Sequence, residues 1–171
     1  MGRVPRLVLL VSAAVILQVA AFPDLRVFGT LPDLVLVLTA AVAYREGPEV
    51  AAVVGFAAGL GVDLFLETPL GLSALAGALA GYALGVVQGA LLRSPRWVAP
   101  VLGAVAGLGG GLIFAAGAIV AGSDTLASGR TVGVILRASG YDALLAPFVF
   151  AAVGRLLRTE REPAAVWRVH Q

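Results

Sequence analysis

The sequence predicts an all-α membrane protein with six transmembrane helices. It is 60% hydrophobic and only 13% charged, whereas soluble domains average roughly 45–50% apolar and about 25% charged residues. Apolar runs recur along the whole chain, and short breaks with proline, glycine or charge separate them. Such runs are typical of helices that cross a bilayer. The chain has no cysteine, so a disulfide framework or a thiolate metal site is excluded.

The first apolar run comprises residues 7–22 and follows Arg3 and Arg6. A positively charged start before an apolar stretch also marks secretory signal peptides. Here, however, further apolar runs follow directly, without a soluble domain between them. We therefore expect the first run to be a transmembrane helix that is not removed.

The second run is assigned to residues 28–44, with Pro32 and Asp33 near its start. Proline suits the first helical turn, and an acidic side chain there faces the positive end of the helix dipole. Counted from Pro32, the run measures about 20 Å at roughly 1.5 Å per residue, short of the roughly 30 Å hydrocarbon core. We expect the helix to begin nearer Phe28, to thin the bilayer, or to be re-entrant. Asp33 is a candidate buried polar residue.

The third and fourth runs form a predicted membrane hairpin. Gly-Pro-Glu at residues 47–49 ends one helix and begins the next, so the third helix is assigned to residues 49–66. Thr68 is a predicted N-cap, and Pro69 fits the first turn of a fourth helix over residues 69–92.

The last two runs follow the same pattern. Residues 93–96 (Arg-Ser-Pro-Arg) form the break before a fifth helix at residues 98–121. A polar loop at residues 122–130 precedes a sixth helix at residues 131–157. The charged cytoplasmic tail, residues 158–171, is expected to fray or to lie at the membrane surface.

Arginine placement predicts the orientation. All 12 basic residues are arginines. If six runs cross, the side with both termini carries Arg3, Arg6, Arg45, Arg93, Arg96, Arg155, Arg158, Arg161 and Arg168. The other side carries Arg26 and Arg130, with Arg137 slightly inside the membrane. This imbalance predicts cytoplasmic termini.

Several function classes lack the residues that they need. The one histidine, His170, lies in the tail, and no nucleophile has a base beside it, so no catalytic site is predicted. No carboxylates and histidines have metal-ligand spacing, and the glycines do not form a phosphate loop, so no metal or cofactor is expected. The arginines form no clustered patch for nucleic acid. We therefore predict that the protein is not an enzyme.

Glycines recur every fourth residue in three of the helices. They are Gly55 and Gly59 in the third run, Gly77, Gly81, Gly85 and Gly89 in the fourth, and Gly103, Gly107 and Gly111 in the fifth. In lipid, small residues let helix backbones approach closely, and that packing holds the helices together. Two interpretations stay open: packing within this chain, or docking of a partner's transmembrane helix.

Three ionisable residues are predicted inside the membrane, where each costs roughly 2.5–3.5 kcal/mol on insertion scales. Asp63 is expected to reach interfacial water or the amides that open the fourth helix. Arg137 can extend outward along its helix. Asp142 lies about 16 Å along the sixth helix and needs a partner from another helix, from Tyr82 or Tyr141, or from water.

Five motifs carry a resemblance to a known family. They are Pro32-Asp33-Leu34, Gly55-Phe56-x-x-Gly59-Leu60-x-x-Asp63-Leu64, Pro69-Leu70-Gly71-x-x-Ala74-Leu75, Gly81-Tyr82-x-x-Gly85 and Tyr141-Asp142-x-Leu144-Leu145-x-Pro147. Residues 31–157 thereby resemble the rod shape-determining MreD family of bacterial membrane proteins. The family often has Tyr-Asn where this chain has Tyr-Asp, so a carboxyl stands where an amide is usual.

The resemblance implies a non-enzymatic scaffold subunit of the cell-wall elongation complex in the bacterial inner membrane. It implies MreC as a partner, and through the complex RodA, a class B penicillin-binding transpeptidase and MreB. The family's fold is similar to the six-helix substrate-binding subunits of energy-coupling-factor transporters. The preferred hypothesis is that glycine-lined grooves dock the transmembrane helix of MreC. The alternatives are a small-molecule-binding transporter subunit, with Asp63, Asp142 and tyrosines lining a pocket, and a scaffold with membrane lipid in an outward-facing cavity.

Overall fold

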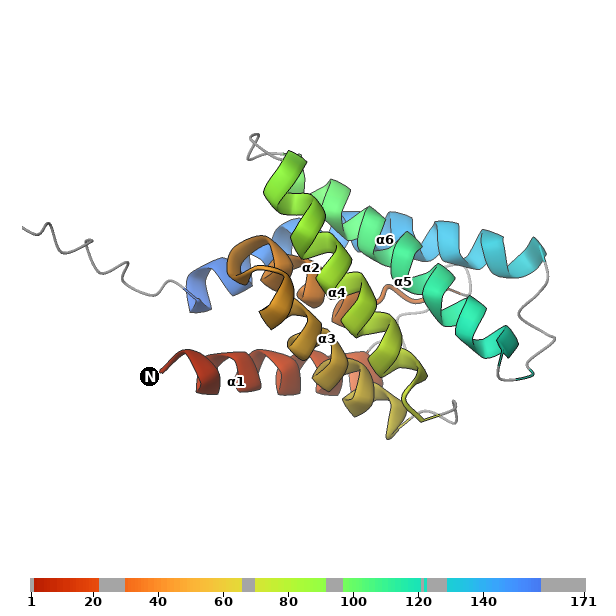
Figure 1. The fold of residues 1–171 in the computed structure, drawn as a ribbon, viewed down its shortest axis with the longest axis horizontal. Helices are drawn as coiled ribbons and strands as arrows, with labels where there is room; N and C mark the ends of the chain where they lie inside the picture. Colours follow the sequence, from red (N-terminus) through yellow and green to blue (C-terminus); the bar gives the residue numbers. More distant parts are fainter. Residues whose placement is uncertain are drawn as a thin grey trace, which may run out of the picture.

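The computed structural model describes residues 2–21, 30–65, 70–91, 97–120, 122 and 129–157. Within these ranges the chain forms six α-helices and one π-helical turn (Figure 1). They are α1 (Arg3–Ile16), the π-helical turn η1 (Leu17–Ala21), α2 (Leu34–Glu46), α3 (Pro48–Asp63), α4 (Leu72–Leu91), α5 (Val98–Val120) and α6 (Gly129–Leu156). The prediction of an all-α membrane protein with six helices is confirmed.

The helices differ in length and hydropathy. Among the described residues, three segments are long and apolar enough to cross a membrane: Arg3–Ala20, Val98–Val120 and Thr131–Leu156. α4 holds a shorter apolar stretch, Leu72–Gln88. α3 has 16 residues and α2 only 13.

The starts of α1, α2 and α4 differ from the predictions. α1 already begins at Arg3. α2 begins at Leu34, and the four residues before it, from Thr30 to Asp33, are not helical, so the expected start near residue 28 is wrong. The reason is Pro32, because a proline disfavours helical backbone in the residue before it. Asp33 is the N-cap instead, and its Oδ1 accepts a hydrogen bond from the amide of Leu36 at 3.0 Å.

The connection between α2 and α3 follows the prediction. Gly47 has a φ of 89°, which favours glycine, and Pro48 is the first residue of α3. After the hairpin turn, Gly71 has a φ of 93° and α4 begins at Leu72, three residues later than expected. The predicted N-cap Thr68 and Pro69 lie outside the described residues.

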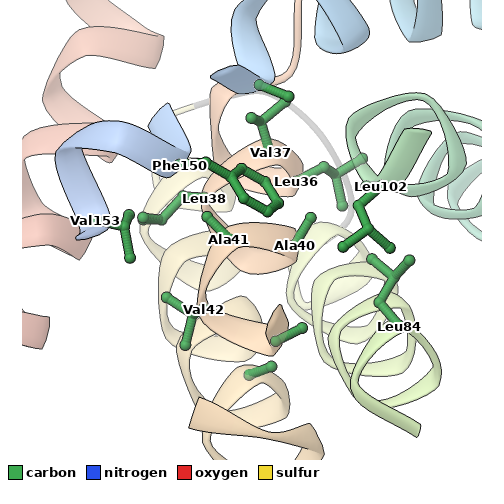
Figure 2. Close-up of a cluster of buried hydrophobic side chains, with 14 of the residues drawn as sticks. Leu36, Val37, Leu38, Ala40, Ala41, Val42, Leu84, Leu102, Phe150 and Val153 are labelled. Carbon is green, nitrogen blue, oxygen red and sulfur yellow. The ribbon is translucent and has the colours of Figure 1, made fainter. Parts of the chain in front are cut away.

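α2 is the centre of the bundle. Every residue from Leu34 to Ala43 is buried, on all faces of the helix. Figure 2 shows Leu84 of α4, Leu102 of α5 and Phe150 of α6 around it. A helix that is apolar on all sides is expected to be enclosed by protein. Because its neighbours separate α2 from lipid, its 13 residues need not match the bilayer thickness.

Glycines bring α3 and α4 into backbone contact. A Cβ on Gly55 would overlap the carbonyl group of Gly77, and one on Gly59 would overlap the carbonyl group of Ser73. Gly81 and Gly85 lie in the same way against Ala51 and Pro48. The two helices are therefore antiparallel and packed as closely as their backbones allow.

Contacts between helix ends define one end of the bundle. Arg3 at the start of α1 pairs with Glu46 at the end of α2. The guanidinium group of Arg45 lies against Gly154 near the end of α6. Together with the packing of α4 onto Pro48, these contacts gather the N-terminus, the α2–α3 turn and the ends of α4 and α6. The sequence predicts the same helix ends on one side of the membrane, the side with most of the arginines.

Candidate functional site

The start of α2 lies inside the bundle, and side chains from other elements bind its backbone. Helix N-termini have free amides, which must find acceptors where there is no water. Gln18 of η1 accepts from the amide of Leu34 at 2.8 Å and donates to the carbonyl of Pro32 at 3.3 Å. Asp142 of α6 accepts from the amide of Asp33 through Oδ1 at 2.6 Å. Two polar side chains thus hold the non-helical entry into α2.

Asp142 is fully buried at this site. Its second oxygen, Oδ2, has no hydrogen-bond partner among the described residues. This oxygen lies against Gly107 of α5, where a Cβ would overlap it. The partner of Asp142 thus comes from another helix, but it is a backbone amide at the start of α2 rather than Tyr82 or Tyr141.

Asp63 has a different position and role. It is buried at the end of α3, and its Oδ2 accepts from the amides of Gly71 at 2.9 Å, Ser73 at 3.1 Å and Ala74 at 3.3 Å. These are the amides that open α4, one of the two surroundings expected for this carboxylate; the other was interfacial water. Asp63 therefore fastens the α3–α4 hairpin and does not join Asp142 in one site.

Arg137 lies on the exposed surface of α6. Its Nε donates to the carbonyl of Gly133 at 3.0 Å, one turn nearer the start of the helix. The side chain thus extends toward the helix end, as expected for an arginine in a membrane segment.

The glycine ridges serve packing within the chain. Gly55, Gly59, Gly77, Gly81 and Gly85 join α3 to α4. Gly103 and Gly107 lie against α6, and a Cβ at position 111 would lie 3.0 Å from Ile135. Gly89 is part of α4, but its surroundings are outside the described side chains. The expected docking grooves along residues 77–85 and 103–111 are therefore filled by the chain's own helices.

Two open glycines lie outside the ridges that the sequence pattern singled out. Around Gly109 of α5 and Gly140 of α6, no heavy atom of the described chain comes within 4 Å of the point that a Cβ would occupy. The sequence did not indicate that these two glycines are open, because a regular spacing does not distinguish a helix face covered by another helix from an uncovered one.

A cavity of about 320 Å³ lies beside the start of α2. Its lining comes mainly from α2, α3, α4, α5 and α6, and its polar side chains are Gln18, Asp33, Ser73 and Thr131. The expected pocket lined by Asp63, Asp142 and tyrosines is wrong for this cavity, because none of those residues lines it. Gln18 was not among the predicted site residues, although a single amide side chain within an apolar run indicates a candidate functional group.

Within the described ranges, no group of three His, Cys, Asp or Glu residues could hold a metal ion. The polar groups of the bundle instead bind backbone: Gln18 and Asp142 at α2, and Asp63 at α4. These hydrogen bonds hold the starts of two helices, and among the described residues Asp33 is the one acidic residue that lines the cavity.

Comparison with known proteins gives one family. No curated protein and no solved structure matches the chain, so the likeness to transporter subunits stays a prediction. Residues 2–121, more than two thirds of the 171 residues, match the family described as rod shape-determining protein MreD. The chain therefore belongs to the rod shape-determining protein MreD family.

Proposed function

We propose that this chain is a non-enzymatic scaffold subunit of the cell-wall elongation complex in the bacterial inner membrane. It docks the transmembrane helix of MreC and thereby supports peptidoglycan synthesis and cell shape. RodA, a class B penicillin-binding transpeptidase and MreB are reached through the complex. Family membership supports the role in rod shape.

The observation that carries the scaffold role is the use of the buried polar side chains. Gln18, Asp63 and Asp142 all bind backbone amides of helices in the same chain. A catalytic group has to reach a reacting atom of a substrate, whereas these groups hold the ends of α2 and α4. Their arrangement favours a rigid bundle that presents its outer faces to other proteins.

The outer face of α6 is the best candidate for docking, because the glycines of α3, α4 and α5 are largely occupied. Leu136, Gly140, Leu144 and Phe148 recur every fourth residue, and all four are exposed. Leu144 and Phe148 are 71% and 74% exposed. The open Gly140 forms a notch between these large side chains, where another helix can approach closely.

Cysteine crosslinking in cells tests this docking. The chain has no native cysteine, so a single introduced thiol is the one reactive thiol. Gly140→Cys and Leu144→Cys are paired with a series of single cysteines along the MreC transmembrane helix. The matched control is Val53→Cys on α3, which is 69% exposed and lies on another face.

Disulfide adducts to MreC are expected from positions 140 and 144, with a helical period along MreC, and none from position 53. Adducts from position 53 alone, or no adduct from either position on α6, would reject the α6 face. No adduct to MreC from any exposed position would reject the docking role itself.

A further inference from the structure

The cavity beside α2 has the chemistry of a binding site for an amphiphile. Its volume of about 320 Å³ is near the lower end of the range for small-molecule pockets, roughly 300–1,000 Å³. Most of its lining is apolar, with Leu36, Val62, Phe114 and Ile135 among the larger side chains. A hydrocarbon chain fits such a surface.

The polar residues of the lining favour a ligand group that donates hydrogen bonds. Gln18 uses both ends of its amide on the backbone around Asp33. Asp33 also lines the cavity, and its carboxyl is held by a bond from the amide of Leu36. A carboxyl has more acceptor sites than the one that Leu36 uses, and in a low dielectric a further hydrogen bond to it is strong.

The same carboxyl disfavours an anion. Behind Asp33 stands a second carboxyl, that of Asp142, which binds the Asp33 amide. An anionic group placed against Asp33 would therefore meet two carboxyl groups. A group with N–H donors, such as a primary ammonium, suits the oxygen acceptors at this end of the cavity.

We propose that this cavity binds an amphiphile with a hydrocarbon chain and a primary amine head that donates to the Asp33 carboxyl. Two kinds of molecule have this combination of groups: a membrane lipid with an ethanolamine head group, or a free long-chain amine. The inference does not depend on the docking of MreC, since the α6 residues that line the cavity, Thr131, Val134 and Ile135, are not those of the docking face.

Lipid retention by the full chain tests the head group. Purified protein in mild detergent is exchanged into phosphatidylethanolamine or phosphatidylcholine with identical acyl chains, and bound lipid is counted by native mass spectrometry. The two head groups share their charges, but only ethanolamine has N–H donors. We expect ethanolamine lipid to be retained about tenfold better, the ratio that one hydrogen bond to a charged group provides.

Asp33→Asn replaces the carboxyl by an amide and keeps a good N-cap, so the start of α2 is preserved. The retention ratio should fall toward one in this variant. Because the ratio compares two lipids on the same folded sample, a lower yield cannot imitate this result. Equal retention in the unchanged protein, or an unchanged ratio in the variant, would overturn the proposal.

Decylamine and decyltrimethylammonium, added to delipidated protein, distinguish the sources. A thermal shift with decylamine but no retained ethanolamine lipid identifies a free amine as the ligand, and retained ethanolamine lipid identifies the bilayer as the source. Binding of neither, or equal binding of decanoate, would reject the amine head.

A matched pair of variants locates the site. Ala115 lines the cavity and is 9% exposed, whereas its neighbour Ala116 is exposed on the outside of α5. Ala115→Phe should fill the cavity and abolish retention, and Ala116→Phe should leave it unchanged. Equal retention by the two variants would place the lipid elsewhere. Should Ala115→Phe not fold, the ratio measured with Asp33→Asn decides.

Discussion

At the scale of single residues, Asp142 and Gly107 form one unit across α5 and α6. The carboxyl holds the amide of Asp33 with one oxygen, and the glycine leaves room for the other. Because Oδ2 has no partner among the described residues, the site needs one acceptor and not a full charge. An amide oxygen at this position would supply the same acceptor.

Asp142→Asn should therefore leave stability within about 1 kcal/mol, since its oxygen still accepts from Asp33. Asp142→Leu leaves that buried amide without an acceptor, which costs roughly 1–3 kcal/mol. The thermal midpoint in detergent measures both. A midpoint that falls equally in the two variants would show that the charge, and not the acceptor, is needed.

Gly107 and Gly109 provide a matched pair on α5. Gly107→Ala places a methyl group against Oδ2 of Asp142, and overpacking of this kind costs roughly 1–3 kcal/mol. Gly109 faces open space, so Gly109→Ala should be neutral or stabilising by up to about 1 kcal/mol through helix propensity. Chemical denaturation in mixed micelles measures the difference. Equal effects would argue against the close α5–α6 contact.

At the scale of elements, the α3–α4 hairpin is held in two ways. Glycines bring the two backbones together along their length, and Asp63 binds the amides at the turn. The close packing of the hairpin encloses α2, the short helix whose start forms the site. Substitutions that disrupt the hairpin are therefore expected to disturb the site at the start of α2.

Gly81→Leu should prevent this packing, because a leucine would collide with the backbone of Ala51 and with Thr39 of α2. Ala83→Leu, on the exposed face of the same helix, is the control and should behave like the unchanged protein. Fluorescence-detected size exclusion of membrane extracts gives the folded yield. A normal yield for Gly81→Leu would show that this contact is not required.

Asp63→Asn should be tolerated, since an asparagine oxygen still accepts from the amides of Gly71 and Ser73. Asp63→Ala removes the acceptor and should cost about 0.5–2 kcal/mol, the range for loss of a helix cap. Thermal unfolding with the same detergent measures both variants. Rounded cells with a normal level of Asp63→Asn protein would instead assign the charge a role in signalling to the synthase.

At the scale of the whole molecule, the helix ends determine the orientation that we propose. The N-terminus, the α2–α3 turn and the end of α6 lie together through Arg3, Glu46, Arg45 and Gly154. Arginine-rich ends favour the cytoplasm. The turn between α3 and α4 lies at the opposite end, and so the bundle has one arginine-rich side.

Single cysteines test this orientation. Leu70→Cys, in the exposed turn before α4, should react with a membrane-impermeant maleimide on intact spheroplasts. Gly2→Cys should react only after the membrane is opened. Labelling of both positions from the same side would reject the arrangement.

The sequence by itself determined the class and the number of helices in the described chain. These depend on local chemistry: apolar runs form helices, and residues such as Gly47 and Pro48 end and begin them whatever lies nearby. The sequence also placed Asp33 at a helix start, because capping involves neighbours three residues apart. Four of the five family motifs lie within the match over residues 2–121, and they too are local patterns.

Only the tertiary structure decided what the buried groups bind. Asp142 and the amide of Asp33 are 109 residues apart in the chain, and Gln18 reaches Leu34 across a break in helical structure. The structure also decided that Gly107 is covered and Gly109 is open, two positions apart on one helix. Sequence spacing gives the face on which a residue lies but not the element opposite that face. That element is chosen by the packing of the other five helices around α2, which no local pattern encodes.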